Sequence, residues 1–183
     1  MTYEDKLAKE LKNPGGYLWP PDSVPLSSLE GLVEDLLPQN QIPGTNIAAI
    51  FILHQLSEEL IKIILKYCDL IVRASIFPIK YSSTPSFNDL KYSELIKLLT
   101  NTIEFQNKSH LIKKLKKLND IRNLVGHNLI KEFYNISDDI SHSKLKDLYD
   151  EIFKTMIKNL EWFSAEIQHL KKRKELQKIL EKD

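Results

Sequence analysis

The sequence DIRNLVGHNL, residues 120–129, lies within the strongest helical pattern of the chain. Apolar residues recur there at spacings of three and four, which predicts one buried helix face made of Leu111, Leu115, Leu118, Val125, Leu129 and Phe133. At about 100° per residue, Arg122 falls within that apolar arc. Because a guanidinium stays charged and is costly to bury alone, we expect a partner to meet Arg122.

Two further residues of this stretch stand out. His127 lies five residues after Arg122, about 140° around the helix, whereas Asn123 shares the face of His127. One straight helix therefore does not bring Arg122 and His127 together over a small ligand, but two copies packed antiparallel across a two-fold axis would do so. Gly126 costs about 1 kcal/mol relative to alanine in a helix, which predicts a close approach by another backbone or a ligand.

The pattern RNLVGH, residues 122–127, resembles the Arg-polar-x-x-x-His motif of the HEPN superfamily of small all-α domains. The match covers six residues with two fixed positions. The resemblance implies a helical bundle of about four to five core helices that forms a homodimer with a metal-independent ribonuclease cleft. It assigns Arg122 and His127 to that cleft, and gives Asn123 the role of orienting the histidine.

The same resemblance bears on biological role. HEPN domains occur in bacterial toxins, antiphage systems and RNA-processing enzymes. We therefore expect a toxin or an antiviral defence effector whose partner is an antitoxin or another regulatory protein. One branch, paired with nucleotidyltransferase-like antitoxins, carries a tyrosine two residues after the histidine, where this chain has Leu129. The difference speaks against AMP transfer to such a tyrosine.

Metal-independent RNA cleavage moves a proton off the ribose 2′-hydroxyl and another onto the departing 5′-oxygen. An imidazole suits these transfers, and a fixed guanidinium stabilises the negative charge on the phosphorane. Lys113, Lys116 and Lys117 precede the motif on the same helix and are candidates to bind flanking phosphates. The simpler interpretation is a solvated lysine face, an Arg122 stem packed on the core and a His127 bonded to a neighbour.

Composition sets the broad class. Hydrophobic residues make up 42% and charged residues 28% of 183 residues, which is typical of a globular protein. The net charge of +1 does not indicate general affinity for nucleic acid. Cys68 is the single cysteine, the first residues are polar and acidic, and no apolar run is long enough to span a membrane. We therefore expect a cytoplasmic protein.

Proline and glycine concentrate before residue 45 and predict a loop-rich N-terminal arm, residues 1–44, packed on a HEPN-like helical domain of residues 45–183. The expected helices lie near Tyr3–Leu11, Ser28–Leu37, 45–73, Phe87–Ile103, Lys108–Tyr134 and from Ser143 onward. The helix over 45–73 is apolar on almost every side, which predicts burial on more than one face. No strand is expected, so the predicted class is all-α.

Other chemistry is weakly indicated. His54 and Glu58 are four residues apart, but two ligands without a third do not make a metal site, and a helix-surface hydrogen bond is the simpler interpretation. The sequence has no phosphate-binding glycine loop, nucleophile elbow or zinc spacing, so neither a metal nor a cofactor is expected. Two main hypotheses remain: a metal-independent endoribonuclease, or a non-catalytic helical dimer that binds RNA, a nucleotide or a partner protein. A helical regulator unrelated to HEPN proteins is the third.

Overall fold

The computed structural model describes residues 1–18, 24–37, 43–81, 87–132 and 142–181. Within these ranges the chain forms helices joined by turns and contains no strand, so the predicted all-α class is confirmed. The α-helices are α1 (Tyr3–Lys12), α2 (Pro14–Leu18), α3 (Val24–Leu36), α4 (Pro43–Ile76), α5 (Tyr92–Thr100), α6 (Lys108–Glu132), α7 (His142–Leu170) and α8 (Lys174–Leu180). A short 3-10 helix, η1 (Phe87–Asp89), precedes α5.

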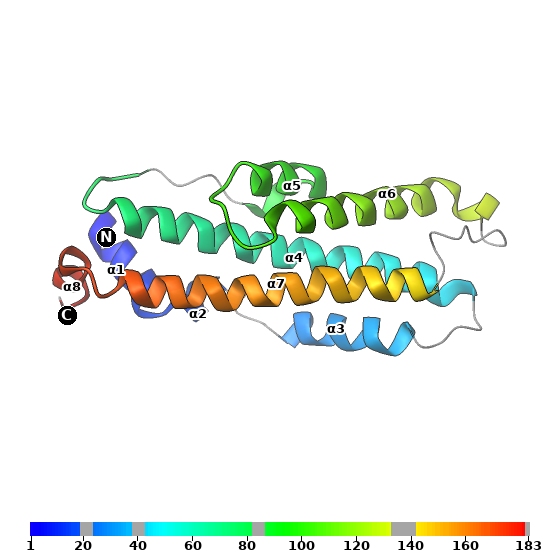
Figure 1. Cartoon of the computed structure of the whole chain (residues 1–183), viewed down its shortest axis with the longest axis horizontal. Helices are drawn as coiled ribbons and strands as arrows, with labels where there is room; N and C mark the ends of the chain where they lie inside the picture. Colours follow the sequence, from blue (N-terminus) through cyan, green and yellow to red (C-terminus); the bar gives the residue numbers. More distant parts are fainter. Residues whose placement is uncertain (19–23, 38–42, 82–86, 133–141, 182–183) are drawn as a thin grey trace.

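The long helices form an elongated bundle. Helices α4 and α7 lie side by side along the long axis and run in the same direction, whereas α6 runs in the opposite direction and packs against both (Figure 1). Helix α5 covers α4 and α6, and α3 packs on α4. Helices α1, α2 and α8 gather at the end of the bundle where both chain termini lie (Figure 1).

Helix α4 is the central element. It has 34 residues, which corresponds to about 51 Å, and it contacts α1, α2, α3, α5, α6 and α7. Its apolar side chains are buried on most sides: Ile50, Leu53, Leu56, Leu60, Ile61, Ile64, Leu65, Leu70 and Ile71. The predicted burial on more than one face is confirmed. None of the described helices combines the length and the apolar character needed to cross a membrane.

The proline-rich segment is more helical than predicted. Pro14 is the first residue of α2, Pro25 is the second residue of α3, and Pro43 is the first residue of α4. The amide groups of a first helical turn have no partner within the helix, so a proline there loses no hydrogen bond and its fixed φ favours the helix. Pro14, Pro25 and Pro43 therefore lie in first helical turns, whereas the proline content of this segment predicted loops; Pro20, Pro21 and Pro38 lie outside the described residues.

The connection between α5 and α6 is held in place by buried polar groups. The predicted helix over Phe87–Ile103 is instead η1 followed by the shorter α5. After α5, the Nζ atom of Lys108, at 3% exposure, donates to the Thr102 carbonyl at 2.7 Å. The Asn159 amide of α7 donates to the Gln106 carbonyl at 3.1 Å. These bonds fix the point at which α6 begins and so the register of α6 against its neighbours.

A buried ion network joins α1 to α4. The Arg73 guanidinium contacts Glu10 of α1 at 2.6 Å and Asp69 at 2.8 Å, and all three side chains are at most 9% exposed. Nearby, Arg173 donates to the carbonyls of Ala74 and Ser75 at the C-terminal end of α4, at 3.1 and 2.5 Å. These contacts place α1 and the start of α8 against the end of α4.

Replacing Arg73 tests the ion network. Arg73→Met leaves the buried carboxylates of Glu10 and Asp69 without their shared cation, and we expect the free energy of unfolding to fall by about 3–5 kcal/mol. Urea denaturation followed by circular dichroism measures this loss. The control is Lys154→Ala, which removes an exposed pair with Asp150 at 3.6 Å and costs less than about 1 kcal/mol. Equal losses in the two variants would show that the network does not stabilise the fold.

Candidate functional site

The buried face of α6 agrees with the prediction where the structure describes it. Leu111, Leu115, Leu118 and Val125 are each at most 4% exposed. The side chain of Leu129 and residue Phe133 lie outside the described part of the chain. By its position around the helix axis Arg122 belongs to this face, but its side chain is only half-buried. The arginine therefore stands where the bundle surface meets the core.

The partner of Arg122 is an aromatic ring. Its guanidinium carbon lies 5.5 Å from the centre of the Phe51 ring of α4, within range of a cation–π contact. Its Nη1 atom donates to Oδ1 of Asn123 at 3.3 Å. Among the residues that the structure describes, no carboxylate forms an ion pair with Arg122. Phe51 and Asn123 thus hold the guanidinium in position, and no described carboxylate neutralises its charge.

Phe51 is more exposed than its sequence pattern predicts. It lies on the apolar surface of α4, yet 37% of it is exposed. The Arg122 stem and guanidinium cover part of the ring, and the charged group must keep contact with water. Leu124 of α6 is also 40% exposed. Leu124 follows Arg122 by two residues, about 200° around α6, so it lies on the opposite side of the helix. The α4–α6 surface beside Arg122 is apolar at the Phe51 ring and carries a cation without a carboxylate partner among the described residues.

His127 is exposed on α6, away from the Arg122 contact. The structure brings Arg122 and Asn123 together within one chain, but no contact joins either of them to His127 among the described residues. Gly126 lies between them, and a Cβ atom placed there would be 3.9 Å from Nη1 of Arg122. Within the described chain, the group nearest to Gly126 is therefore the arginine, and no other backbone makes the predicted close approach.

A second histidine lies beside Arg122. His54 of α4 is half-buried, and its Nε2 atom lies 3.5 Å from Oδ1 of Asn119 on α6. Its ring stacks on Tyr92 of α5, with 3.9 Å between ring centres. The hydroxyl of Tyr92 is in turn bonded to Oγ of Ser57 at 2.8 Å. Three helices thus hold the His54 imidazole in one orientation.

Burial favours the neutral form of His54. Burial lowers the pKa of His54, the bond to Asn119 raises it, Arg122 lowers it and Glu58 raises it, with a net decrease. The sequence singled out His54 only for its spacing to Glu58. Its position near Arg122 depends on the register of α4 against α6. The periodicity of residues within one helix does not predict that register.

The predicted pairing of His54 with Glu58 is replaced by an ion pair. Lys62 contacts Glu58 at 2.9 Å and Glu59 at 2.8 Å. Among the described residues, no group of three histidine, cysteine or acidic side chains is arranged to hold a metal ion. His54 and Glu58 therefore act on each other through charge alone.

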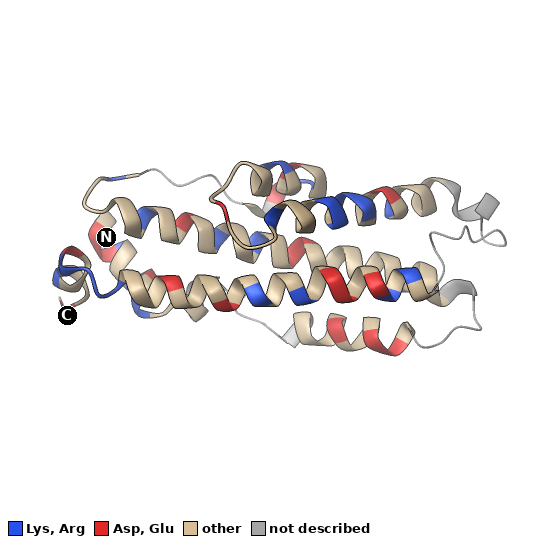
Figure 2. Cartoon of the chain, viewed as in Figure 1, with Lys and Arg blue, Asp and Glu red and all other residues tan. Residues whose placement is uncertain are grey.

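The lysines of α6 form a basic stripe. Lys113, Lys116 and Lys117 are exposed, and Figure 2 shows several basic residues along α6 and several acidic residues along α7. Lys114 forms an ion pair with Glu151 of α7, which takes it out of the stripe. At 100° per residue, Lys113, Lys116 and His127 share one side of the helix, with Lys117 farther around. The stripe leads toward His127 along the surface.

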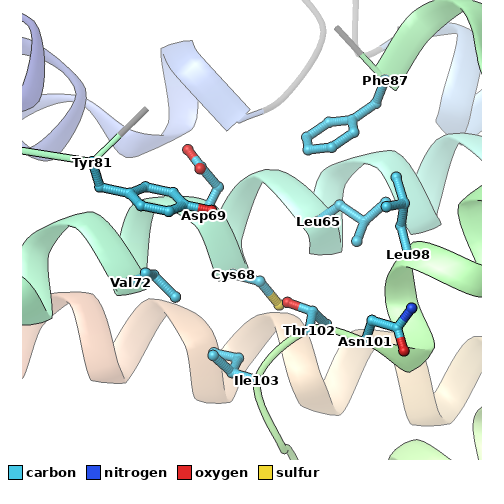
Figure 3. Close-up of a pocket in the computed structure, with 10 residues that line it drawn as sticks. All are labelled: Leu65, Cys68, Asp69, Val72, Tyr81, Phe87, Leu98, Asn101, Thr102 and Ile103. Carbon is cyan, nitrogen blue, oxygen red and sulfur yellow. The ribbon is translucent and has the colours of Figure 1, made fainter. Parts of the chain in front are cut away.

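A cavity of about 240 Å³ lies elsewhere, between α4 and the segments around α5. Figure 3 shows Cys68, Asp69 and Thr102 among its lining residues. Burial raises the pKa of Cys68 to about 11, so its thiol is a poor nucleophile. Leu65, at the near edge of the cavity, is eleven residues beyond His54, about 16 Å along α4. The cavity is thus separate from the Arg122 site.

Gly126 offers a direct test of local packing. Gly126→Ala adds a Cβ at ordinary van der Waals distance from Arg122, so we expect it to raise the free energy of unfolding by about 0.5–1 kcal/mol through helix propensity. Gly31→Ala in α3 is the control, because its Cβ meets nothing within 4 Å. Urea denaturation at low protein concentration compares the two. Loss of stability in Gly126→Ala alone would contradict the open surroundings of this glycine.

Comparison with known proteins adds no relative: no family model, curated protein or solved structure matches this chain. The resemblance of residues 122–127 to the HEPN motif is therefore a local one. The case for a function rests on the arrangement of the side chains around Arg122.

Proposed function

We propose that the chain is a metal-independent endoribonuclease of the HEPN type, acting as a homodimer. Arg122 and His127 are the catalytic residues, Asn123 positions them, and Lys113, Lys116 and Lys117 bind RNA. The observation that carries the proposal is the half-buried Arg122 guanidinium, which has no carboxylate partner among the described residues. A fixed cation of this kind suits a substrate that brings its own negative charge.

The reaction needs two proton transfers. One imidazole takes the proton of the ribose 2′-hydroxyl as the 2′-oxygen bonds to phosphorus, and the bond from phosphorus to the 5′-oxygen breaks. A second, protonated imidazole gives its proton to that 5′-oxygen. The products are a 2′,3′-cyclic phosphate and a 5′-hydroxyl. Each of the two protomers supplies one His127 for these proton transfers and one Arg122 to stabilise the phosphorane charge.

The dimer is supported by the separation of Arg122 and His127 within one chain. An isologous pairing of α6 surfaces brings the arginine of one protomer toward the histidine of the other. The exposed side chain of Phe51 lies beside Arg122, and the exposed side chain of Leu124 lies on the side of α6 that carries His127. An exposed aromatic ring beside an arginine is typical of interface centres.

The basic stripe on α6 supports RNA as the ligand. Lys116 is eleven residues before His127, about 16 Å along the helix, and lies on the same side. A single strand that follows the stripe places successive phosphates against the lysines. Since the net charge is only +1, selectivity arises from this local surface. A cytoplasmic toxin or antiphage effector, held inactive by a regulatory protein, is the corresponding biological role.

A non-catalytic helical dimer is the second candidate. It is favoured by the Asn123 side chain, whose oxygen accepts a hydrogen bond from Arg122 and makes no described contact with His127. In this case Arg122 clamps an RNA phosphate, a nucleotide or a partner carboxylate without turnover.

The decisive measurement is RNA cleavage by the purified chain in the presence of a chelator. We expect a product ending in a 2′,3′-cyclic phosphate, and we expect Arg122→Ala and His127→Ala each to lower the rate at least about 100-fold. His169→Ala on α7 is the control, because His169 is exposed and distant in sequence from the site. Circular dichroism and light scattering check that the variants keep their helices and their oligomeric state.

The outcomes separate the candidates. Equal cleavage by the wild type and His127→Ala would rule out the proposed mechanism. RNA binding without cleavage, lost in Arg122→Ala, would favour the binding module. Insensitivity of both binding and cleavage to Arg122 and His127 would exclude either use of this surface.

A further inference from the structure

The geometry points to a phosphate site formed within a single chain by Arg122 of α6 and His54 of α4. In this site, one phosphate group of RNA lies between the guanidinium and the imidazole, and Asn119 holds the imidazole. The inference rests on the proposed function for its ligand, and it adds a residue from outside the α6 motif. It also makes the anion site independent of the second protomer.

The register of the two helices places these side chains together. Helices α4 and α6 are antiparallel (Figure 1). Arg122 meets Phe51, and Asn119, three residues earlier on α6, meets His54, three residues later on α4. Three residues correspond to about 4.5 Å along a helix, so the two contacts are neighbouring steps of one α4–α6 interface. The imidazole and the guanidinium therefore border the same part of the surface.

The charges at this point suit an anion. Arg122 has no carboxylate partner among the described residues, and the acidic groups next along α4, Glu58 and Glu59, both contact Lys62. A phosphate oxygen accepts hydrogen bonds from a guanidinium and from an imidazole N–H, and charged donors make these bonds strong. The site thus offers the Arg122 guanidinium and, once His54 is protonated, the imidazole nitrogen that does not face Asn119.

The imidazole is also fixed before a ligand arrives. Its stack on Tyr92 and its contact with Asn119 restrict both tilt and rotation of the ring. Tyr92 is itself held by Ser57, whose hydroxyl also donates to the His54 carbonyl at 2.9 Å. A donor that is already ordered loses little entropy on binding. A surface histidine without such supports would bind a phosphate less tightly.

Binding must be linked to the protonation of His54. The charged groups that act on it are Arg122 of α6, which lowers its pKa, and Glu58 of α4, which raises it, while Tyr92 of α5 contributes a neutral ring. A bound phosphate adds negative charge and favours the imidazolium, so it raises the pKa of His54. Phosphate affinity therefore increases as the pH falls through the pKa of His54 in the complex.

The experiment uses the full chain with isotope-labelled histidine and NMR of the ring carbons. The probe is a short single-stranded oligoribonucleotide with 2′-O-methyl groups, which lacks the attacking hydroxyl. We expect the probe to raise the pKa of His54, and Arg122→Ala to abolish that rise. We expect His54→Gln to weaken probe binding about tenfold at pH 6, as for the loss of one charge-assisted hydrogen bond. His169→Ala should bind like the wild type.

Each result bears on one proposal. If the probe changes the His127 resonance and leaves the pKa of His54 unaltered, the single-chain site is wrong and the dimeric ribonuclease remains. If His54 responds to the probe but unmodified RNA is not cut, the phosphate site stands and the ribonuclease proposal fails. If neither histidine responds, or if His54→Gln binds as tightly as the wild type, the inference is overturned.

Discussion

The burial of α4 is the constraint on which the rest of the structure depends. A 34-residue helix that is apolar on most sides cannot be covered by one partner, so α3, α5, α6 and α7 pack around it. The sides that these helices cover fix the rotation of α4 about its axis. That rotation determines which of its residues face α6, and hence that Phe51 and His54 border the arginine. The position of the site is thus set by the packing of the whole helical core.

Arg122 interrupts this packing at one point of α6. A leucine there would continue the buried face and remove the exposure of Phe51. The arginine instead places a half-buried charge over the Phe51 ring, without a carboxylate partner among the described residues. Elsewhere the chain pairs its buried charges, as Arg73 with Glu10 and Asp69 shows. The buried Arg73 thus has two carboxylate partners, whereas the half-buried Arg122 has none among the described residues.

Periodicity predicted the all-α class, the buried face of α6 and the anomaly at Arg122, because each depends on residues within one helix. The proline content of residues 1–44 was a poorer guide. A proline can follow the end of a helix or stand in its first turn, and composition does not distinguish these two positions. Periodicity failed at His54. That residue and Asn119 are 65 positions apart, and their contact depends on how α5 and the loop before α6 set the offset between two helices. Side-chain spacing along one helix carries no information on such an offset.

The position of the chain ends has a practical consequence. The first and last helices, α1 and α8, lie together at one end of the bundle, whereas the α6 motif lies toward the other (Figure 1). From Phe51 to the end of α4 the chain rises about 38 Å. A fluorescent domain fused to either terminus, or immobilisation on a sensor surface through a terminal tag, therefore leaves the surface around Arg122 facing the solution.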